Sequence, residues 1–177
     1  RRSTIKLISW PVAAVIEFIR STPLLVQLFF LFYVMPQHFN VTLSPFATGA
    51  LGLGIHYACY TSESYRAGIE SVDRGQWEAA TAMNLATTTT WTRIILPQAI
   101  PTVIPALGNY LVAMFKDAPL LSTITVIELL AAADRVQAIT FRSTEAYTMA
   151  GVLFLAVSIP SAALVRYLER RFRYERA

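Results

Sequence analysis

The stretch EAATAMNLATTTTWTRIILP, from Glu78 to Pro97, decides how this chain is organised. It carries one Glu, one Arg, one Asn and six Thr, yet strongly apolar segments lie on both sides of it. Its spacing predicts two short helices with a break between them. Asn84 stands where the first helix should stop, and Asn accepts the left-handed backbone that ends many helices. We therefore expect a helical hairpin, and we call residues 71–97 the polar insertion.

The two arms of this hairpin have different signals. The first arm is predicted from Gln76 to Met83. The second should be capped by one of the four threonines at 87–90, since a Thr hydroxyl can accept a hydrogen bond from a free backbone N–H. Trp91, Ile94 and Ile95 give the second arm an apolar face, and Pro97 is expected to close the hairpin and open the next segment.

The composition points to a membrane protein. The chain has 177 residues, of which 55% are hydrophobic and 15% charged, with a mean hydropathy of +0.48. Soluble domains usually carry about 25% charged residues. A soluble helical domain with a rich core is the alternative. It is disfavoured because a core of this size could not hide so many aromatic side chains.

Long apolar runs predict four membrane spans, at about 10–35, 46–70, 98–116 and 146–166. Inside the first, Pro23 fits the first turn of a second helix with Ser21 or Thr22 as its N-cap, so the chain should bend there. The second span presents small side chains that would let neighbouring helices approach closely. These are Gly49, Gly52, Gly54, Ala58 and Ser62.

The basic residues set the expected orientation. With the N-terminal end inside, residues 36–45 fall outside, the polar insertion inside, residues 117–145 outside and the tail inside. Of the 15 Lys and Arg residues, all lie at inside ends except Lys116, Arg135, Arg142 and the ambiguous Arg20. This is the distribution that the positive-inside rule expects, and it argues against nucleic-acid binding as the reason for the net charge of +4.

Catalysis and metal binding find no support in the sequence. The one cysteine, Cys59, excludes a disulfide within the chain and a cysteine-based metal site, and the two histidines have no metal-ligand spacing. A membrane-embedded enzyme using His56 and Glu63, seven residues apart, is conceivable, but no further catalytic group accompanies them. We therefore predict no catalytic residues, no metal and no bound cofactor.

The polar insertion resembles the EAA loop of bacterial ABC importer permeases. That loop has Glu-Ala-Ala, a Gly four positions after the second Ala, and Ile-x-Leu-Pro ten positions later. The matching residues here are Glu78, Ala79, Ala80, Asn84, Ile94, Leu96 and Pro97. The single departure is Asn84 in the place of Gly, and Asn can meet the same backbone demand.

Further segments resemble the polar amino-acid branch of this family, which serves His, Glu, Gln, Arg and opines. They are RSTPLLVQLFFLFY (20–33), YRAGIESVDRGQWEAA (65–80), LPQAIPTVIPALGN (96–109) and FKDAPLLSTI (115–124). The resemblance implies an all-α, polytopic helix bundle of the ABC type I importer kind. It would form one permease domain over residues 1–177 with a cytoplasmic EAA helix pair. The family has five spans, so one is expected before Arg1.

The resemblance also implies the partners. A second permease subunit, identical or related, would complete the pathway in a bacterial inner membrane. Two cytoplasmic ATPases, which bind ATP and Mg²⁺, would grip the EAA helices, and an extracytoplasmic binding protein would deliver the solute. The chain itself lacks a phosphate-binding loop, so it is expected to be a transport subunit and not an enzyme.

Ionisable residues within spans are candidates for the transport pathway, because their burial in a membrane is costly. The candidates are Glu63, Lys116, Asp117 and Glu128. Glu63 has the alternative of pairing with Arg66. In the amino-acid branch an acidic residue at the place of Asp117 and a Glu seven positions earlier are expected to face the solute, but Tyr110 holds the earlier place here. The predicted pathway residues are Tyr57, Tyr60, Glu63, Tyr110 and Asp117.

These residues favour a particular cargo. Tyr110, with Tyr57, Tyr60 or Phe115, could hold a delocalised cation by cation–π contact while Asp117 accepts a hydrogen bond. The segments 108–116 and 118–130 are similar to the permeases of ectoine and hydroxyectoine uptake systems. We therefore expect ectoine or hydroxyectoine as the solute. A polar amino acid of the glutamine or arginine type is the alternative, and a passive channel or structural membrane subunit is the distant one.

Overall fold

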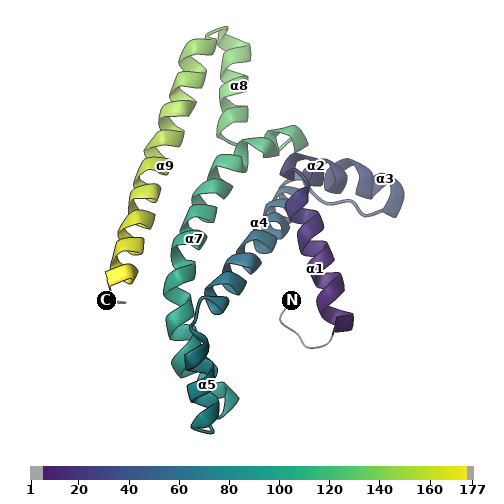
Figure 1. Ribbon diagram of the computed structural model, residues 1–177. Coiled ribbons are helices and arrows are strands. Elements are labelled where there is room, and N and C mark those ends of the chain that lie inside the picture. The colour runs from purple at the N-terminus through teal and green to yellow at the C-terminus, as the bar shows by residue number, and fades with distance from the viewer. Residues whose placement is uncertain (1–5, 175–177) are drawn as a thin grey trace. The chain divides into compact units, whose positions relative to one another are not determined.

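The computed structural model describes residues 6–174, and all its regular secondary structure is helical (Figure 1). This confirms the prediction of an all-α chain. Arg1 and Arg2, which entered the argument about orientation, lie outside the described residues. The helices, including π-helical and 3-10 segments labelled η, are α1 Lys6–Ser21, α2 Leu24–Phe29, η1 Phe30–Val34, α3 Met35–Phe39, α4 Pro45–Glu70, α5 Arg74–Ala82, α6 Thr87–Thr89, η2 Thr90–Ile95, α7 Leu96–Asp117, η3 Ala118–Ile124, α8 Leu129–Thr140 and α9 Ser143–Tyr174.

The chain divides into two compact units, which are described separately. The first unit holds Arg1–Tyr60 and Ala113–Ser158, and the second holds Thr61–Val112 and Ile159–Ala177. The long helices α4, α7 and α9 each contribute residues to both units.

The core of the first unit joins α2 to η3. Leu24 and Leu28 of α2 pack on Ile124 of η3, surrounded by five half-buried apolar residues. Two of the predicted small residues of α4 make this packing possible, since a Cβ on Gly52 would overlap Leu28 and a Cβ on Gly49 would overlap Leu121. Gly54, in contrast, faces open space. The prediction of close helix approach is therefore confirmed at Gly49 and Gly52, and it stays a prediction at Gly54.

The bend predicted at Pro23 is sharp. The segments Ser9–Ser21 and Leu24–Phe39 meet at 107°. Pro23 itself occupies the N-cap position of α2, with φ −62° and ψ 139° and no side-chain cap, so the prediction of Ser21 or Thr22 as N-cap is wrong. The side chain of Thr22 bonds to the preceding helix instead. Its hydroxyl oxygen lies 3.0 Å from the Phe18 carbonyl oxygen and 3.2 Å from the Ile19 carbonyl oxygen. The hydroxyl therefore satisfies the end of α1, where carbonyls lack partners.

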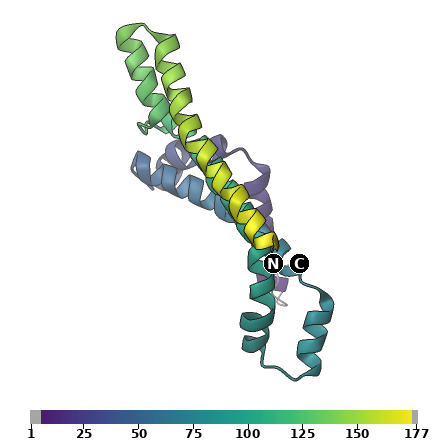
Figure 2. The same ribbon diagram turned by 90° about the vertical axis from the view of Figure 1, so that its left-hand side faces the viewer.

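The polar insertion forms the predicted hairpin, from α5 to η2 in the second unit (Figure 2). Asn84 has φ 53°, as predicted for the residue that ends the first arm. The N–H of Leu85 donates to Ala80 O at 3.1 Å and the N–H of Asn84 donates to Thr81 O at 3.0 Å. These two bonds form a Schellman motif, which satisfies carbonyls at the end of α5.

The helix starts in the hairpin differ from the prediction. Asp73 caps α5, its carboxylate accepting from the N–H of Gly75 at 2.7 Å, so the first arm starts before Gln76. Ala86 is the N-cap of the second arm and no threonine caps it. Thr90 bonds back to the Ala86 carbonyl at 3.2 Å instead, a local bond that Thr makes inside helices.

Pro97 does not end the second arm. Helical residues continue from Thr87 through η2 into α7 without a gap. Pro97 lacks an N–H, and its ring crowds the carbonyl four residues earlier. The π-helical turn η2 ends at Ile95, two residues before Pro97, and η1 ends at Val34, two residues before Pro36. Both prolines are therefore accommodated by a widened turn, not by a break.

Two helices in residues 6–174 are long and apolar enough to cross a membrane, Thr87–Ile124 and Ser143–Arg171. A third crossing results if the bent pair Ser9–Ser21 and Leu24–Phe39 counts as one. α4 covers the predicted span 46–70 closely but is not among these helices, and its second half includes Glu63 and Arg66. That α4 crosses the membrane stays a prediction.

Candidate functional site

The hairpin presents part of the predicted coupling motif to solvent. Glu78, Ala79, Asn84 and Pro97 are exposed. Ala80 is buried, with 2% of its surface exposed. Ile94 packs on the core of the second unit, which consists of Val72, Ile95 and Ala99, and Leu96 is half-buried. Some residues of the motif are thus exposed and accessible to a partner, whereas others are buried or half-buried within the second unit.

Two tryptophans join the arms of the hairpin. The rings of Trp77 and Trp91 meet edge to face, and both pack on the core of the second unit. Beside them lies a cavity of about 350 Å³ lined by Trp77, Thr81, Asn84, Leu85, Thr87, Thr90 and Trp91. The arms therefore touch through aromatic side chains and leave a hollow near the turn.

A strip of polar aromatic side chains follows one face of α4 in the first unit. We call His56, Tyr57 and Tyr60 the α4 strip. The Tyr57 hydroxyl donates to Oδ2 of Asp117 at 2.7 Å, and Tyr57 is only 7% exposed. The ring of Tyr60 lies 6.5 Å from that of Tyr57 and 5.0 Å from that of His56. The structure therefore brings together three of the five predicted pathway residues, Tyr57, Tyr60 and Asp117.

Gln27 of α2 connects the bend at Pro23 to the α4 strip. Its Nε2 donates to Ile19 O at 2.7 Å, to Thr22 O at 3.1 Å and to Thr22 Oγ1 at 2.9 Å. Its Oε1 lies 3.1 Å from Nδ1 of His56. Sequence reasoning gave no role to Gln27, because the contact joins residues 29 positions apart and no local pattern marks it.

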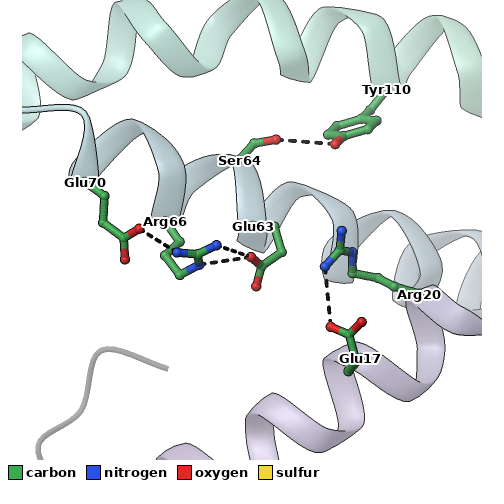
Figure 3. A network of polar contacts seen from close by, with 7 residues as sticks. All are labelled: Glu17, Arg20, Glu63, Ser64, Arg66, Glu70 and Tyr110. Atoms are coloured by element: carbon green, nitrogen blue, oxygen red, sulfur yellow. Dashed lines mark hydrogen bonds and ion pairs between the residues drawn. The ribbon is translucent and has the colours of Figure 1, made fainter.

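Arg20 lies at the other side of the strip. Its guanidinium is 5.4 Å from the centroid of the Tyr60 ring, within the range of a cation–π contact, and the Tyr60 hydroxyl donates to the Arg20 carbonyl at 3.3 Å. Arg20 also forms a loose ion pair, since its Nη1 lies 3.7 Å from Oε2 of Glu17 (Figure 3). The buried Nε of Arg20 has no hydrogen-bond partner among the described residues.

Glu63 and Tyr110, the other two predicted pathway residues, lie in the second unit and have partners of their own (Figure 3). Glu63 accepts from Arg66, with Oε2 2.9 Å from Nε and 2.8 Å from Nη2. Arg66 also bonds Glu70 at 2.5 Å. The alternative stated for Glu63, pairing with Arg66, is therefore what the structure has. The Ser64 hydroxyl donates to the hydroxyl oxygen of Tyr110 at 3.4 Å.

Two further expectations need correction. The carboxylate of Glu128 accepts from the backbone N–H groups of Leu130 at 2.8 Å and Ala131 at 2.7 Å, so Glu128 is the N-cap of α8. The ring of Phe115, proposed as a companion of Tyr110, pairs with Phe154 in the first unit at 5.3 Å. Both side chains thus have structural partners.

Comparison with known proteins gives a consistent picture. Residues 5–174 match the family described as binding-protein-dependent transport system inner membrane component. The chain is 51% identical to a probable amino-acid ABC transporter permease protein, y4tG of Sinorhizobium fredii, over 92% of this chain and 70% of that protein. It is 41% identical to the L-cystine transport system permease protein TcyB of Bacillus subtilis, over 78% of this chain but only 58% of that one.

A solved structure is similar in both fold and sequence. The crystal structure of an amino acid ABC transporter with histidines superposes with a TM-score of 0.89 at 36% identity, covering 96% of this chain and 78% of that one. The family match, over residues 5–174, covers all of the described residues. The chain therefore belongs to the family of inner membrane components of binding-protein-dependent transport systems, the permease subunits of ABC transporters.

Proposed function

We propose that this chain is the permease subunit of an importer for polar amino acids. The relatives reported above carry names that refer to amino acids and to L-cystine, and these names support the amino-acid alternative better than ectoine. Membership of the family implies an ATPase partner and a solute-binding partner. A second permease subunit completing the pathway is part of the proposal.

The observation that carries the proposal is the arrangement of charges along the α4 strip. At one side the carboxylate of Asp117 is held by Tyr57, and at the other the guanidinium of Arg20 lies against Tyr60. An amino acid carries an ammonium and a carboxylate at neutral pH. A strip with a carboxylate at one side and a guanidinium at the other is complementary to such a zwitterion.

The exposed part of the hairpin supports the coupling role. Glu78 and Ala79 are exposed on α5, while Trp77 of α5 packs against Trp91 of the second arm. An ATPase that grips this surface would move α5 and α7 together, because they share the core formed by Val72, Ile95 and Ala99. Such movement would switch the bundle between outward- and inward-facing arrangements.

Uptake by the complete transporter tests the proposal. The permease, its ATPase and its binding protein are reconstituted in proteoliposomes. Uptake of labelled glutamine, arginine, cystine and ectoine is then measured with and without ATP on the ATPase side. We expect ATP-dependent uptake of at least one of the three amino acids. Uptake of ectoine alone would overturn the amino-acid proposal, and uptake that needs no ATP would establish a passive channel.

A matched pair of variants tests the role of Asp117. Asp117→Asn removes the charge and keeps the shape, and losing one charge-assisted hydrogen bond costs about 1.5–3 kcal/mol, or roughly tenfold and more. We expect uptake at least about tenfold lower. Asp134→Asn removes the same charge from an exposed position on α8 and should leave uptake nearly unchanged. Equal effects of the two variants would reject a solute contact at Asp117.

A further inference from the structure

The hydrogen bonds around Gln27 fix which way its amide points. Three oxygen atoms surround one end of the amide, namely Ile19 O, Thr22 O and Thr22 Oγ1. Carbonyl oxygens only accept hydrogen bonds, so the NH₂ group must be at this end. The Thr22 hydroxyl agrees with this, because it donates to a backbone carbonyl and is left to accept from Gln27. The amide oxygen of Gln27 therefore faces His56.

This orientation determines the tautomer of His56. An amide oxygen cannot donate, so Nδ1 of His56, 3.1 Å away, must carry the proton of their hydrogen bond. In a neutral imidazole the other nitrogen, Nε2, is then an acceptor. Among the residues that the structure describes, none bonds to Nε2, and the side chain is partly exposed. His56 thus presents an acceptor that the fold leaves unused.

On the Asp117 side the surroundings add acceptors, while the guanidinium of Arg20 lies at the other side of the strip, against Tyr60. The Tyr57 hydroxyl donates its proton to Oδ2 of Asp117, and the second oxygen of that carboxylate has no partner within residues 6–174. The rings of Tyr57 and Tyr60 lie 5.5 Å and 5.0 Å from the His56 ring. Acceptors between aromatic faces suit N–H groups, and a cationic N–H group best of all.

We propose that His56, held in its Nδ1–H tautomer by Gln27, uses Nε2 to accept a hydrogen bond from an N–H group of the solute's side chain. The site then prefers side chains with N–H donors, such as the amide of glutamine or the guanidinium of arginine, and disfavours the carboxylate of glutamate. Gln27 is a positioning residue that acts through His56. The inference deepens the proposed function and rests on it.

Direct binding measures this preference. Labelled glutamine, arginine and glutamate are equilibrated with the purified permease–ATPase complex without the binding protein, whose own selectivity would mask that of the permease. We expect glutamine or arginine to bind at least about tenfold tighter than glutamate, the ratio that one lost hydrogen bond to a charged group can supply. Equal or tighter binding of glutamate, or no binding of any of the three, overturns the inference.

Variants of His56 separate hydrogen bonding from packing. His56→Phe keeps the aromatic ring and removes the acceptor, so the dissociation constant of the preferred solute should rise about tenfold while that of glutamate stays the same. His56→Gln restores an acceptor oxygen and should recover most of the affinity. Unchanged affinity in His56→Phe, with an unchanged Tm of the complex as proof of folding, rejects the role of Nε2.

Gln27 needs a control because it also holds the bend at Pro23. Gln27→Met removes the bond to His56, whereas Thr22→Val removes one partner of Gln27 and leaves that bond in place. We expect weaker solute binding in Gln27→Met alone. In the His56→Phe background, Gln27→Met should add less than about twofold, because residues acting through one contact are not additive. Effects that multiply would show that Gln27 acts only on the bend.

These experiments also distinguish a failure of the proposed His56 contact from a failure of the proposed amino-acid import. Transport of glutamate with the same preference as glutamine would refute the acceptor role of His56 and leave the importer of polar amino acids intact. Failure of all amino acids in the uptake experiment would refute both.

Discussion

Trp77 and Trp91 meet edge to face across the hairpin, with ring centroids 5.2 Å apart and an angle of 80° between the rings. This is a preferred geometry of aromatic pairs, because the positive edge of one ring faces the negative face of the other. The two residues lie 14 positions apart in sequence, and their contact is a direct link between the arms.

Replacing Trp91 by alanine should therefore loosen the hairpin. Loss of the buried ring area and of the pair costs about 2 kcal/mol. We expect faster hydrogen exchange in α5 and lower ATP-driven uptake. Trp10→Ala is the control, because Trp10 is 78% exposed on α1. Exchange in α5 that stays the same in Trp91→Ala would show that the two arms do not depend on this contact.

Asn84 offers a test of the backbone at the end of α5. With φ 53°, Asn84→Ala should cost about 1–2 kcal/mol, since the left-handed conformation crowds Cβ. Asn84→Gly has no Cβ and should be neutral or slightly stabilising. Thermal unfolding and uptake should both follow the order Gly, Asn, Ala. A variant with alanine that performs as well as the one with glycine would contradict the Schellman motif as the source of the constraint.

Gly68 and Gly54 form a matched pair on α4. A Cβ on Gly68 would overlap Val103 and approach the Ala99 carbonyl, whereas nothing lies within 4 Å of a Cβ on Gly54. Gly68→Ala should lower the Tm of the complex by forcing α4 away from α7. Gly54→Ala should raise it slightly, because Ala is favoured over Gly inside helices by about 1 kcal/mol. The reverse order would mean that another partner, not open space, covers Gly54.

Charge reversal at Glu78 tests the proposed ATPase contact. Glu78 is exposed on α5, so Glu78→Lys should leave the fold intact and reduce both co-purification of the ATPase and ATP-driven uptake. Glu169→Lys makes the same change on exposed α9 and serves as the control. Normal uptake by Glu78→Lys would remove Glu78 from the coupling surface.

Local signals in the sequence predicted local structure well. Asn84 could be placed because few residue types accept the left-handed backbone, and the bend at Pro23 because proline restricts the residue before it. Helix starts were harder. Thr22 and Thr90 were expected to cap helices, but each donates to a carbonyl behind it, a competing use of the same hydroxyl. A sequence does not show which of the two bonds a threonine makes.

Contacts between distant residues could not be predicted. Tyr57 and Asp117 were both named as candidates, yet that they touch follows from how α4 packs on the end of α7. Glu128 was named as an ionisable candidate for the pathway, because the sequence does not reveal that α8 starts just after it and needs a cap. His56 was not among the predicted pathway residues, and its partner Gln27 was missed, since their bond depends on the bend at Pro23.

Helical residues run from Thr87 to Val112 of the second unit with no interruption at Pro97. At 1.5 Å per residue this stretch is about 40 Å long, more than the roughly 30 Å thickness of a bilayer core. Helical residues therefore connect the surface that the ATPase would bind to the segment that would lie in the membrane without a break. A movement that the ATPase imposes on the second arm would therefore be carried into the membrane along one continuous run of helix, and the turn around Asn84 is where the two arms can move relative to each other.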